Sequence, residues 1–166
     1  LVFSFANEVA FLCDNYNIDA FTLIRAANNG YPRNKIPEPS PGVGGSCLAK
    51  DPFLYNNIEK NNNYFREQNL GYTSREINSL GVDYVLWQFS KFIDKINKGS
   101  KLNTLIVGLA FKGWPETDDL RNSNAVDLSE RLLREGHKVF GFDAVVKKED
   151  IDKLNDWDDY IKNNSE

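Results

Sequence analysis

Apolar residues near the start of the chain recur at intervals of three and four, which is the pattern of one helix face. The regular positions are Val2, Phe5, Val9, Leu12 and Cys13. A second and less regular set, Phe21, Leu23 and Ile24, follows it. Residues 1–28 are therefore predicted to form a helical hairpin, with Cys13 in its core.

The next part of the chain predicts a loop and a short helix. Residues 29–46 are rich in Gly, Pro and Asn, the residues that favour loops. Asp51 as N-cap and Pro52 as the first helical residue predict a helix from Pro52 to Lys60. A polar break is expected at residues 61–63.

A long amphipathic helix is predicted over residues 74–97. Its apolar positions follow three-and-four spacing: Ile77, Val82, Val85, Leu86, Phe89, Phe92, Ile93 and Ile96. Lys98-Gly99-Ser100 ends this helix, because glycine is typical just beyond a helix C-terminus. The apolar run 105–107 then has strand character, so we place a domain boundary between residues 1–99 and 100–166.

The second domain reads as strand, loop, helix, strand, over residues 103–109, 123–136 and 138–142. This order is half of a doubly wound α/β domain. The predicted fold class is α + α/β: an all-helical central domain with a long helix, followed by the first half of a doubly wound, Rossmann-like parallel domain.

Two polar residues near the second strand are predicted to be structural. Asp143 closes the strand, but it lies 35 positions after Gly108, whereas a ribose-binding acid follows the glycine motif by about 20. Asp143 is therefore predicted to be a strand-end cap or turn residue. His137 is predicted to lie exposed in a short turn.

Composition excludes several classes of function. The 166 residues are 41% hydrophobic and 27% charged, as in ordinary globular proteins, and the net charge of −4 argues against a general nucleic-acid binder. No apolar run is long enough to span a membrane. Two cysteines without CxxC spacing and a single histidine predict neither a disulfide framework nor a metal site. A reducing cytoplasm is the expected location.

The candidate chemistry lies in residues 41–52, PGVGGSCLAKDP. Cys47 directly follows a glycine-rich turn, whose backbone can approach a ligand closely and offer amides to an anion. The positive end of the following helix and Lys50 both favour negative charge on the sulfur. Cys47 with Asp51 four residues later suggests a nucleophile with a helper. Glycine turns are common, however, and free cysteines are usually buried and inert, so this motif alone leaves both readings open.

A second motif, NTLIVGLAFKGWPETDDLR at residues 103–121, follows the cysteine by some sixty positions. The two motifs together resemble the nucleotide-sugar dehydrogenases that act on UDP-glucose, UDP-N-acetylhexosamines or GDP-mannose. Three shorter pieces resemble the same family: FANEVA at residues 5–10, Ala26-Ala27-Asn28, and REIN at residues 75–78. The motifs occur in the family's order and cover about residues 1–145.

This resemblance implies an NAD-dependent oxidation of a sugar C6 hydroxyl to a carboxylate, by two hydride transfers that use two NAD+ per turnover. Cys47 would attack the aldehyde as a hemithioacetal, and the second oxidation would give a thioester that water hydrolyses. Asp51 resembles the carboxylate that orders or activates this water.

The resemblance also assigns binding residues. The positions that match substrate-binding residues are Gly44, Gly45, Phe111, Lys112 and Arg33, the last contributed across a dimer interface. Arg121 resembles an arginine that reaches the NAD pyrophosphate, and Lys50 is a further cofactor-binding candidate. As an alternative, Arg121 pairs only with Asp118 or Asp119.

Two positions bear on which nucleotide sugar is the substrate. Ser46 stands where many N-acetylmannosamine-type enzymes carry histidine, whereas Asp51-Pro52-Phe53 is closer to the amino-sugar branch. These two signals point to different branches; a UDP-N-acetylhexosamine is favoured, with UDP-glucose next and GDP-mannose still open.

In the family, a dinucleotide-binding domain and a catalytic lysine precede the region that matches residue 1, and further strands follow residue 166. The chain alone is therefore expected to be inactive. An alternative is a non-catalytic module that binds nucleotide sugar and forms a homodimer through the helix at 74–97. The apolar stripe of that helix could equally be internal core.

Overall fold

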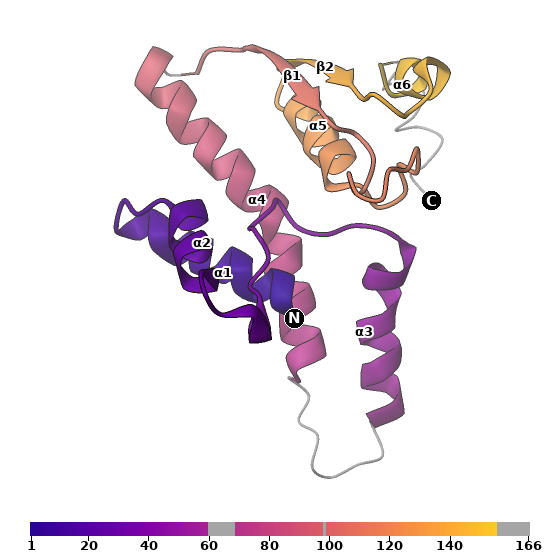
Figure 1. Cartoon of the computed structure of the whole chain (residues 1–166). Coiled ribbons are helices and arrows are strands. Elements are labelled where there is room, and N and C mark those ends of the chain that lie inside the picture. Colours follow the sequence, from indigo (N-terminus) through magenta and orange to yellow (C-terminus); the bar gives the residue numbers. More distant parts are fainter. Residues whose placement is uncertain (60–68, 98, 156–166) are drawn as a thin grey trace. The chain divides into compact units, whose positions relative to one another are not determined.

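A computed structural model gives the fold (Figure 1). It describes residues 1–59, 69–97 and 99–155. In these stretches it has six α-helices, one short 3-10 helix (η1) and two β-strands. The chain divides into two compact units: unit 1 is residues 1–43 and 47–85, and unit 2 is residues 44–46 and 86–166.

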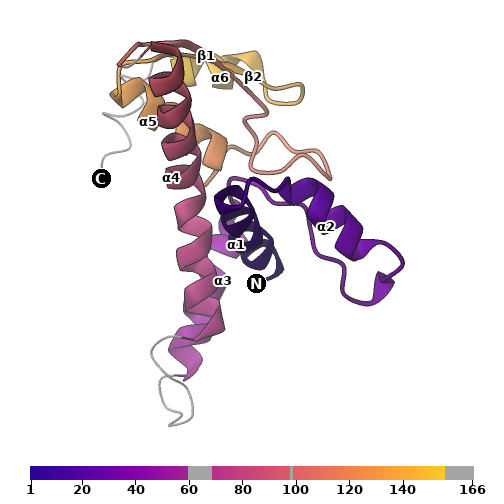
Figure 2. The ribbon, with the colours of Figure 1, turned by 90° about the vertical axis from the view of Figure 1, so that its left-hand side faces the viewer.

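Unit 1 begins with the predicted helical hairpin, which the structure confirms. Helix α1 spans Val2–Asn15 and α2 spans Ala20–Asn28, and the two helices contact each other (Figure 2). Asp19 is the N-cap of α2 and accepts hydrogen bonds from the Phe21 and Thr22 amides. The side-chain hydrogen bond from Thr22, with these amides, lowers the pKa of Asp19. Cys13 is buried in this region, as predicted.

Helix α3 begins earlier than predicted. It spans Ser46–Glu59, directly after Gly45, which has a φ of +90°. Asp51 is therefore not an N-cap, and Pro52 lies inside the helix, where it has no N–H to donate to the Leu48 carbonyl. The prediction was wrong because the left-handed turn at Gly45 lets the helix begin at once, and the helix tolerates the lost bond. The predicted end at Lys60 and the break at 61–63 lie outside the described residues.

The long helix α4 spans Leu70–Asn97. It begins four residues before the predicted start because Asn69 caps it: the Asn69 Oδ1 accepts from the Tyr72 amide at 3.0 Å. It ends where predicted, and Gly99 beyond it has a φ of +77°. The predicted boundary residue Lys98 lies outside the described residues. Among the described helices, none combines the length and the apolar character that crossing a membrane requires.

Unit 2 contains the predicted strand–helix–strand order. Strand β1 spans Asn103–Val107, α5 spans Asn124–Arg134, β2 spans Lys138–Phe142 and α6 spans Lys148–Asn155. The strands pair in parallel, from Asn103 opposite Lys138 to Val107 opposite Phe142. Both α5 and α6 contact β2. The first strand is two residues shorter than predicted because Gly108, with a φ of +88°, turns the chain at its end.

The core of unit 2 lies just beyond the C-terminal end of β1. Leu109 and Val126 are 2% and 7% exposed. The partly buried residues packed against them are Ile106, Leu120, Leu133 and Ile151. A Cβ on Gly141 of β2 would lie 2.8 Å from Leu109 Cδ1, so only glycine fits against this leucine.

His137 is buried, which corrects the prediction of an exposed turn residue. It is 5% exposed, and its Nδ1 accepts a hydrogen bond from the Leu102 amide at 3.1 Å. Its ring meets Phe89 edge-on, with centroids 5.2 Å apart. The turn points inward because the backbone N–H that enters β1 needs an acceptor, and the imidazole supplies it.

Candidate functional site

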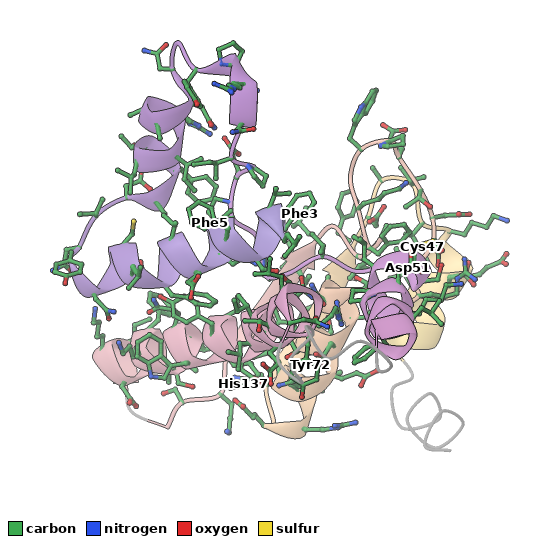
Figure 3. The ribbon with its side chains drawn as sticks, turned by 90° about the horizontal axis from the view of Figure 1, so that it is seen from below. Phe3, Phe5, Cys47, Asp51, Tyr72 and His137 are labelled. Atoms are coloured by element: carbon green, nitrogen blue, oxygen red, sulfur yellow. The ribbon has the colours of Figure 1, made fainter. Side chains whose placement is uncertain are left out.

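The predicted nucleophile is accessible and lies in the first turn of α3. Cys47 is exposed, whereas the other free cysteine, Cys13, is buried. Lys50 and Asp51, three and four residues further along, are exposed on the same helix face. Figure 3 shows Cys47 and Asp51 side by side on α3. The earlier helix start therefore places the sulfur at the helix N-terminus, the end that stabilises negative charge.

Asparagine side chains hold the loop that leads to Gly44 and Gly45. They form hydrogen bonds with its backbone N–H and carbonyl groups, in place of the partners that a strand or a helix would provide. Asn28 at the end of α2 forms two hydrogen bonds with Ile36: its Nδ2 donates to the Ile36 carbonyl and its Oδ1 accepts from the Ile36 amide, both at 2.8 Å. Asn7 of α1 is 2% exposed, and its Oδ1 accepts from the Ser40 amide at 2.9 Å. Both asparagines belong to the short motifs of the sequence, so those motifs shape this loop.

The third motif asparagine, Asn78 of α4, holds the last residue before Gly44. Its Oδ1 accepts from the Val43 amide at 2.8 Å, and its Nδ2 donates to the Val43 carbonyl at 3.1 Å. One turn further along α4, a Cβ on Gly81 would lie 2.1 Å from the Pro41 carbonyl oxygen. Asn78 and Gly81 therefore bring the loop backbone directly against α4.

Within unit 2, Gly44 and Gly45 are buried against residues 108–122, here called the Phe111 loop. A Cβ on Gly44 would lie 2.1 Å from the Asn122 carbonyl oxygen, and one on Gly45 would lie 2.8 Å from the Phe111 ring. The Lys112 Nζ lies 5.2 Å from the centroid of that ring. The structure thus brings together four of the five residues that match substrate-binding positions.

The Phe111 loop is attached at its start to the end of β2. Asp143 accepts hydrogen bonds from the amides of Leu109 and Ala110, at 2.7 and 3.1 Å, and from those of Val145 and Val146. Partial burial raises the pKa of Asp143, but the four backbone donors outweigh it and the net pKa is lowered. Asp143 is a turn residue, as predicted. The sequence did not predict that Asp143 binds the Phe111 loop, because only the parallel pairing of β1 and β2 brings its side chain to that loop.

Arg121, at the other end of the same loop, is paired with Asp119 rather than Asp118. Its Nε lies 2.9 Å from Asp119 Oδ1 and its Nη2 lies 2.7 Å from Oδ2, a two-pronged contact. The Arg121 hydrogen bond holds the pKa of Asp119 at about 2. The guanidinium side chain is nevertheless 75% exposed.

The fifth predicted substrate residue, Arg33, is exposed in η1 (Pro32–Asn34) of unit 1. Unit 1 also has hollows that the sequence did not indicate. One of about 790 Å³ has the lining Val2, Arg25, Asn28, Asn29, Lys35, Ile36, Pro37 and Glu38. A smaller one, of about 290 Å³, has Phe11, Phe21 and Tyr84 among its lining residues. In the described part of the chain, no group of acidic, histidine or cysteine side chains is placed to hold a metal ion.

An exposed cysteine after a clamped glycine loop, and a parallel strand–helix–strand unit after it in the chain, are the features that the resemblance to nucleotide-sugar dehydrogenases implies. Two domain descriptions of one family match the chain. The UDP-glucose/GDP-mannose dehydrogenase family, central domain, matches residues 1–79, and the UDP binding domain of that family matches residues 105–165. The chain belongs to the UDP-glucose/GDP-mannose dehydrogenase family.

Two similar proteins share a name. The chain is 40% identical over 132 residues to the UDP-N-acetyl-D-mannosamine dehydrogenase of Campylobacter jejuni, covering 80% of this chain and 30% of that protein. It is 37% identical over 138 residues to the enzyme of that name from Escherichia coli K12, covering 79% and 30%. A solved structure of the Pyrococcus horikoshii UDP-D-ManNAc dehydrogenase matches with a TM-score of 0.73 at 32% identity, covering 88% and 33%. The chain thus spans about a third of the length of these relatives.

Proposed function

We propose that this chain is the catalytic-cysteine and nucleotide-sugar-binding part of an NAD-dependent UDP-sugar 6-dehydrogenase. The observation that carries the proposal is the exposed thiol of Cys47 in the first turn of α3, with Asp51 one turn further on the same face. The favoured substrate is a UDP-N-acetylhexosamine, because relatives at 37–40% identity are UDP-N-acetyl-D-mannosamine dehydrogenases. UDP-glucose is the next candidate.

The proposed reaction uses Cys47 as a covalent anchor. The Cys47 thiolate adds to the C6 aldehyde and forms a C–S bond, the C=O π electrons move to the aldehyde oxygen, and this oxygen takes up a proton from water to become the hydroxyl of a hemithioacetal. Oxidation of this adduct gives a thioester. Water then attacks the thioester carbon, the C–S bond breaks, and the carboxylate and the free Cys47 sulfur are released. Asp51 orders this water or accepts its proton.

The substrate residues are proposed to act in four ways. Lys112 supplies an exposed positive charge for the diphosphate or the sugar. Gly44 and Gly45 offer backbone amides to the ligand, and the absence of side chains lets this backbone pack against Asn122 and Phe111. Phe111 holds the glycines in place, and Arg33 acts from the partner subunit of a homodimer.

NAD supplies the hydride acceptor in each of the two oxidations when it is bound. The residues proposed to hold it are Arg121 and Lys50. Both are exposed cations, which suits a pyrophosphate, although the Nε and Nη2 of Arg121 are bound to Asp119. The charges of Lys50 and Arg121 therefore suit the cofactor. To form a two-pronged contact with its pyrophosphate, Arg121 has to release Asp119 first.

The test is a Cys47→Ala variant of the complete enzyme, assayed with NAD+ and UDP-N-acetyl-D-mannosamine. We expect no uronate product, because the thioester has no sulfur on which to form. Cys13→Ala is the matched control, since Cys13 is buried in the hairpin and takes no part in the chemistry. Near-normal acid production by Cys47→Ala would contradict the mechanism.

A second candidate is a non-catalytic module that binds UDP-sugars and dimerises. It is favoured by Phe92 and Ile96 of α4, which lie one turn apart on one helix face, are 54% and 58% exposed and offer a homodimer face. Light scattering of the protein with Phe92→Glu tests that face. UDP-sugar binding without NADH formation by the complete protein would favour this candidate.

For either candidate function we propose a cytoplasmic location, because the reducing cytoplasm keeps free thiols such as Cys13 and Cys47 reduced.

A further inference from the structure

We propose that Asp143 is a positioning residue for substrate binding: it fixes the Phe111 loop at the point where that loop leaves β1. This inference rests on the proposed function, because it assumes that Phe111 and Lys112 meet the nucleotide sugar. Asp143 itself is not proposed to touch the substrate. All of the contacts that carry the inference lie within unit 2.

Each carboxylate oxygen of Asp143 accepts hydrogen bonds from a different segment of backbone. Oδ2 accepts from the amides of Leu109 and Ala110, at 2.7 and 3.1 Å, at the start of the Phe111 loop. Oδ1 accepts from the amides of Val145 and Val146, at 2.8 and 3.1 Å, just beyond β2. One side chain thus joins the loops that follow both parallel strands.

A second side chain holds the same peptide from its carbonyl side. Ser123, 4% exposed at the N-cap of α5, donates from Oγ to the Leu109 carbonyl at 2.6 Å. The Leu109 side chain is itself buried in the core of unit 2. The N–H, the carbonyl and the side chain of Leu109 are therefore all fixed, and Phe111 follows only two residues later.

The position of Phe111 matters because its ring fills the space beside Gly45. The clearance is small, since a Cβ on Gly45 would approach the ring to 2.8 Å. Lys112 is next in the chain, so a shift of the Leu109–Ala110 peptide would move both the ring and the cation. Binding sites need such groups held to within about 0.5 Å, which requires a rigid supporting contact of this kind.

The chemistry of four converging amides explains why this residue is a carboxylate. Four N–H donors require four acceptor lone pairs, which two carboxylate oxygens provide. Asparagine has one acceptor oxygen, and its NH2 group would face two further donors. Asp143→Asn should therefore keep one pair of bonds and lose the other, while Asp143→Ala loses both.

The experiment combines amide hydrogen exchange with calorimetric binding of UDP-N-acetyl-D-mannosamine to the complete enzyme. Asp143→Ala should speed exchange of the Leu109, Ala110, Val145 and Val146 amides, whereas Asp143→Asn should do so for one pair only. Asp143→Ala should bind the nucleotide sugar about tenfold more weakly, an effect of the size of one charged hydrogen bond. Asp143→Asn should weaken binding to a similar extent if the pair it releases is Leu109 and Ala110, and should leave binding unchanged if that pair is Val145 and Val146.

The control is Leu132→Val, which lowers stability in the buried part of α5 without touching the Phe111 loop. Its affinity, measured well below its unfolding temperature, should equal that of the wild type. Unchanged amide exchange in Asp143→Ala, or unchanged affinity, would overturn the inference while leaving the proposed function standing. No binding of any UDP-sugar by the wild type would instead overturn the proposed function, and amide exchange would still report whether Asp143 holds the loop.

Discussion

Replacement of Asn78 by alanine should release the loop that leads to Gly44. In the wild type, Asn78 is 5% exposed and makes two hydrogen bonds with the backbone of Val43, at 2.8 and 3.1 Å. Alanine leaves the N–H and the carbonyl of Val43 without these partners. The change touches neither the thiol nor the Phe111 loop, so it isolates the effect of the loop anchor.

The expected loss can be worked out from the contacts. A buried polar group left without its partner costs about 1–3 kcal/mol. Val43 is half-buried, so water replaces part of each bond and a cost of about 1–1.5 kcal/mol, from the lower end of this range, applies to each group. Two groups give about 2–3 kcal/mol, from which the better helix propensity of alanine subtracts about 0.5 kcal/mol. We expect a net loss of about 2 kcal/mol.

Urea unfolding monitored by circular dichroism measures this loss, and amide exchange at Val43 shows where it arises. Ser79→Ala is the matched control, because it makes the same gain in helix propensity on the exposed face of α4. It should change stability by less than about 0.5 kcal/mol. If Asn78→Ala is as stable as this control and the Val43 amide stays protected, the assigned role of Asn78 is wrong.

Three further predictions concern Gly45, Cys47 and Arg121. Gly45→Ala should cost about 2–4 kcal/mol, because a side chain at a φ of +90° is strained and its Cβ would meet an aromatic ring at 2.8 Å. In native protein a thiol reagent should modify Cys47, which is exposed, and should reach Cys13 only after unfolding. Arg121→Ala should return the pKa of Asp119 from about 2 toward 3.8, as an NMR titration would show. Because this pKa is lowered on folding, the ion pair stabilises the protein above pH 3.8, and the effect is lost as pH falls toward 2.

Gly30→Ala is the control for the glycine prediction. Gly30 has a φ of +71°, but nothing lies within 4 Å of the position that a Cβ would take. It should therefore show only the strain of a left-handed residue, about 1–2 kcal/mol. Equal losses at Gly30 and Gly45 would mean that the ring contact adds nothing.

The sequence was most informative where local chemistry decides the structure. Three-and-four spacing of apolar residues located the hairpin, and the run at 105–107 located the first strand, because the period of side-chain burial follows from backbone geometry. The helix starts were less predictable. The sequence indicated Asp51 as the cap of α3 and placed the start of the long helix at residue 74, whereas in the structure Asn69 caps α4 and Asp51 caps nothing. At α3, the left-handed turn at Gly45 decides where the helix begins.

For the candidate site, the residue types were readable and their partners were not. The motifs indicated Cys47 and Asp51, but the predicted helix began only at Pro52, so it was the observed start of α3 at Ser46 that placed both residues on one helix face. Nothing in the sequence connects Gly44 with Asn122, because that contact is made across long intervening segments of chain. His137 shows the same limit, since its burial depends on an amide 35 positions earlier, at Leu102.

The sequence by itself indicated the hairpin, the long helix, the strand–helix–strand order, the family and Cys47 as the proposed nucleophile, since each of these follows from local spacing and motif order. Only the tertiary structure decided which backbone groups the polar side chains satisfy. Asn78 holds Val43, and Asp143 holds Leu109, across 35 and 34 positions of chain. The physical reason is that buried N–H and carbonyl groups must find partners, and packing alone decides which side chain comes within reach.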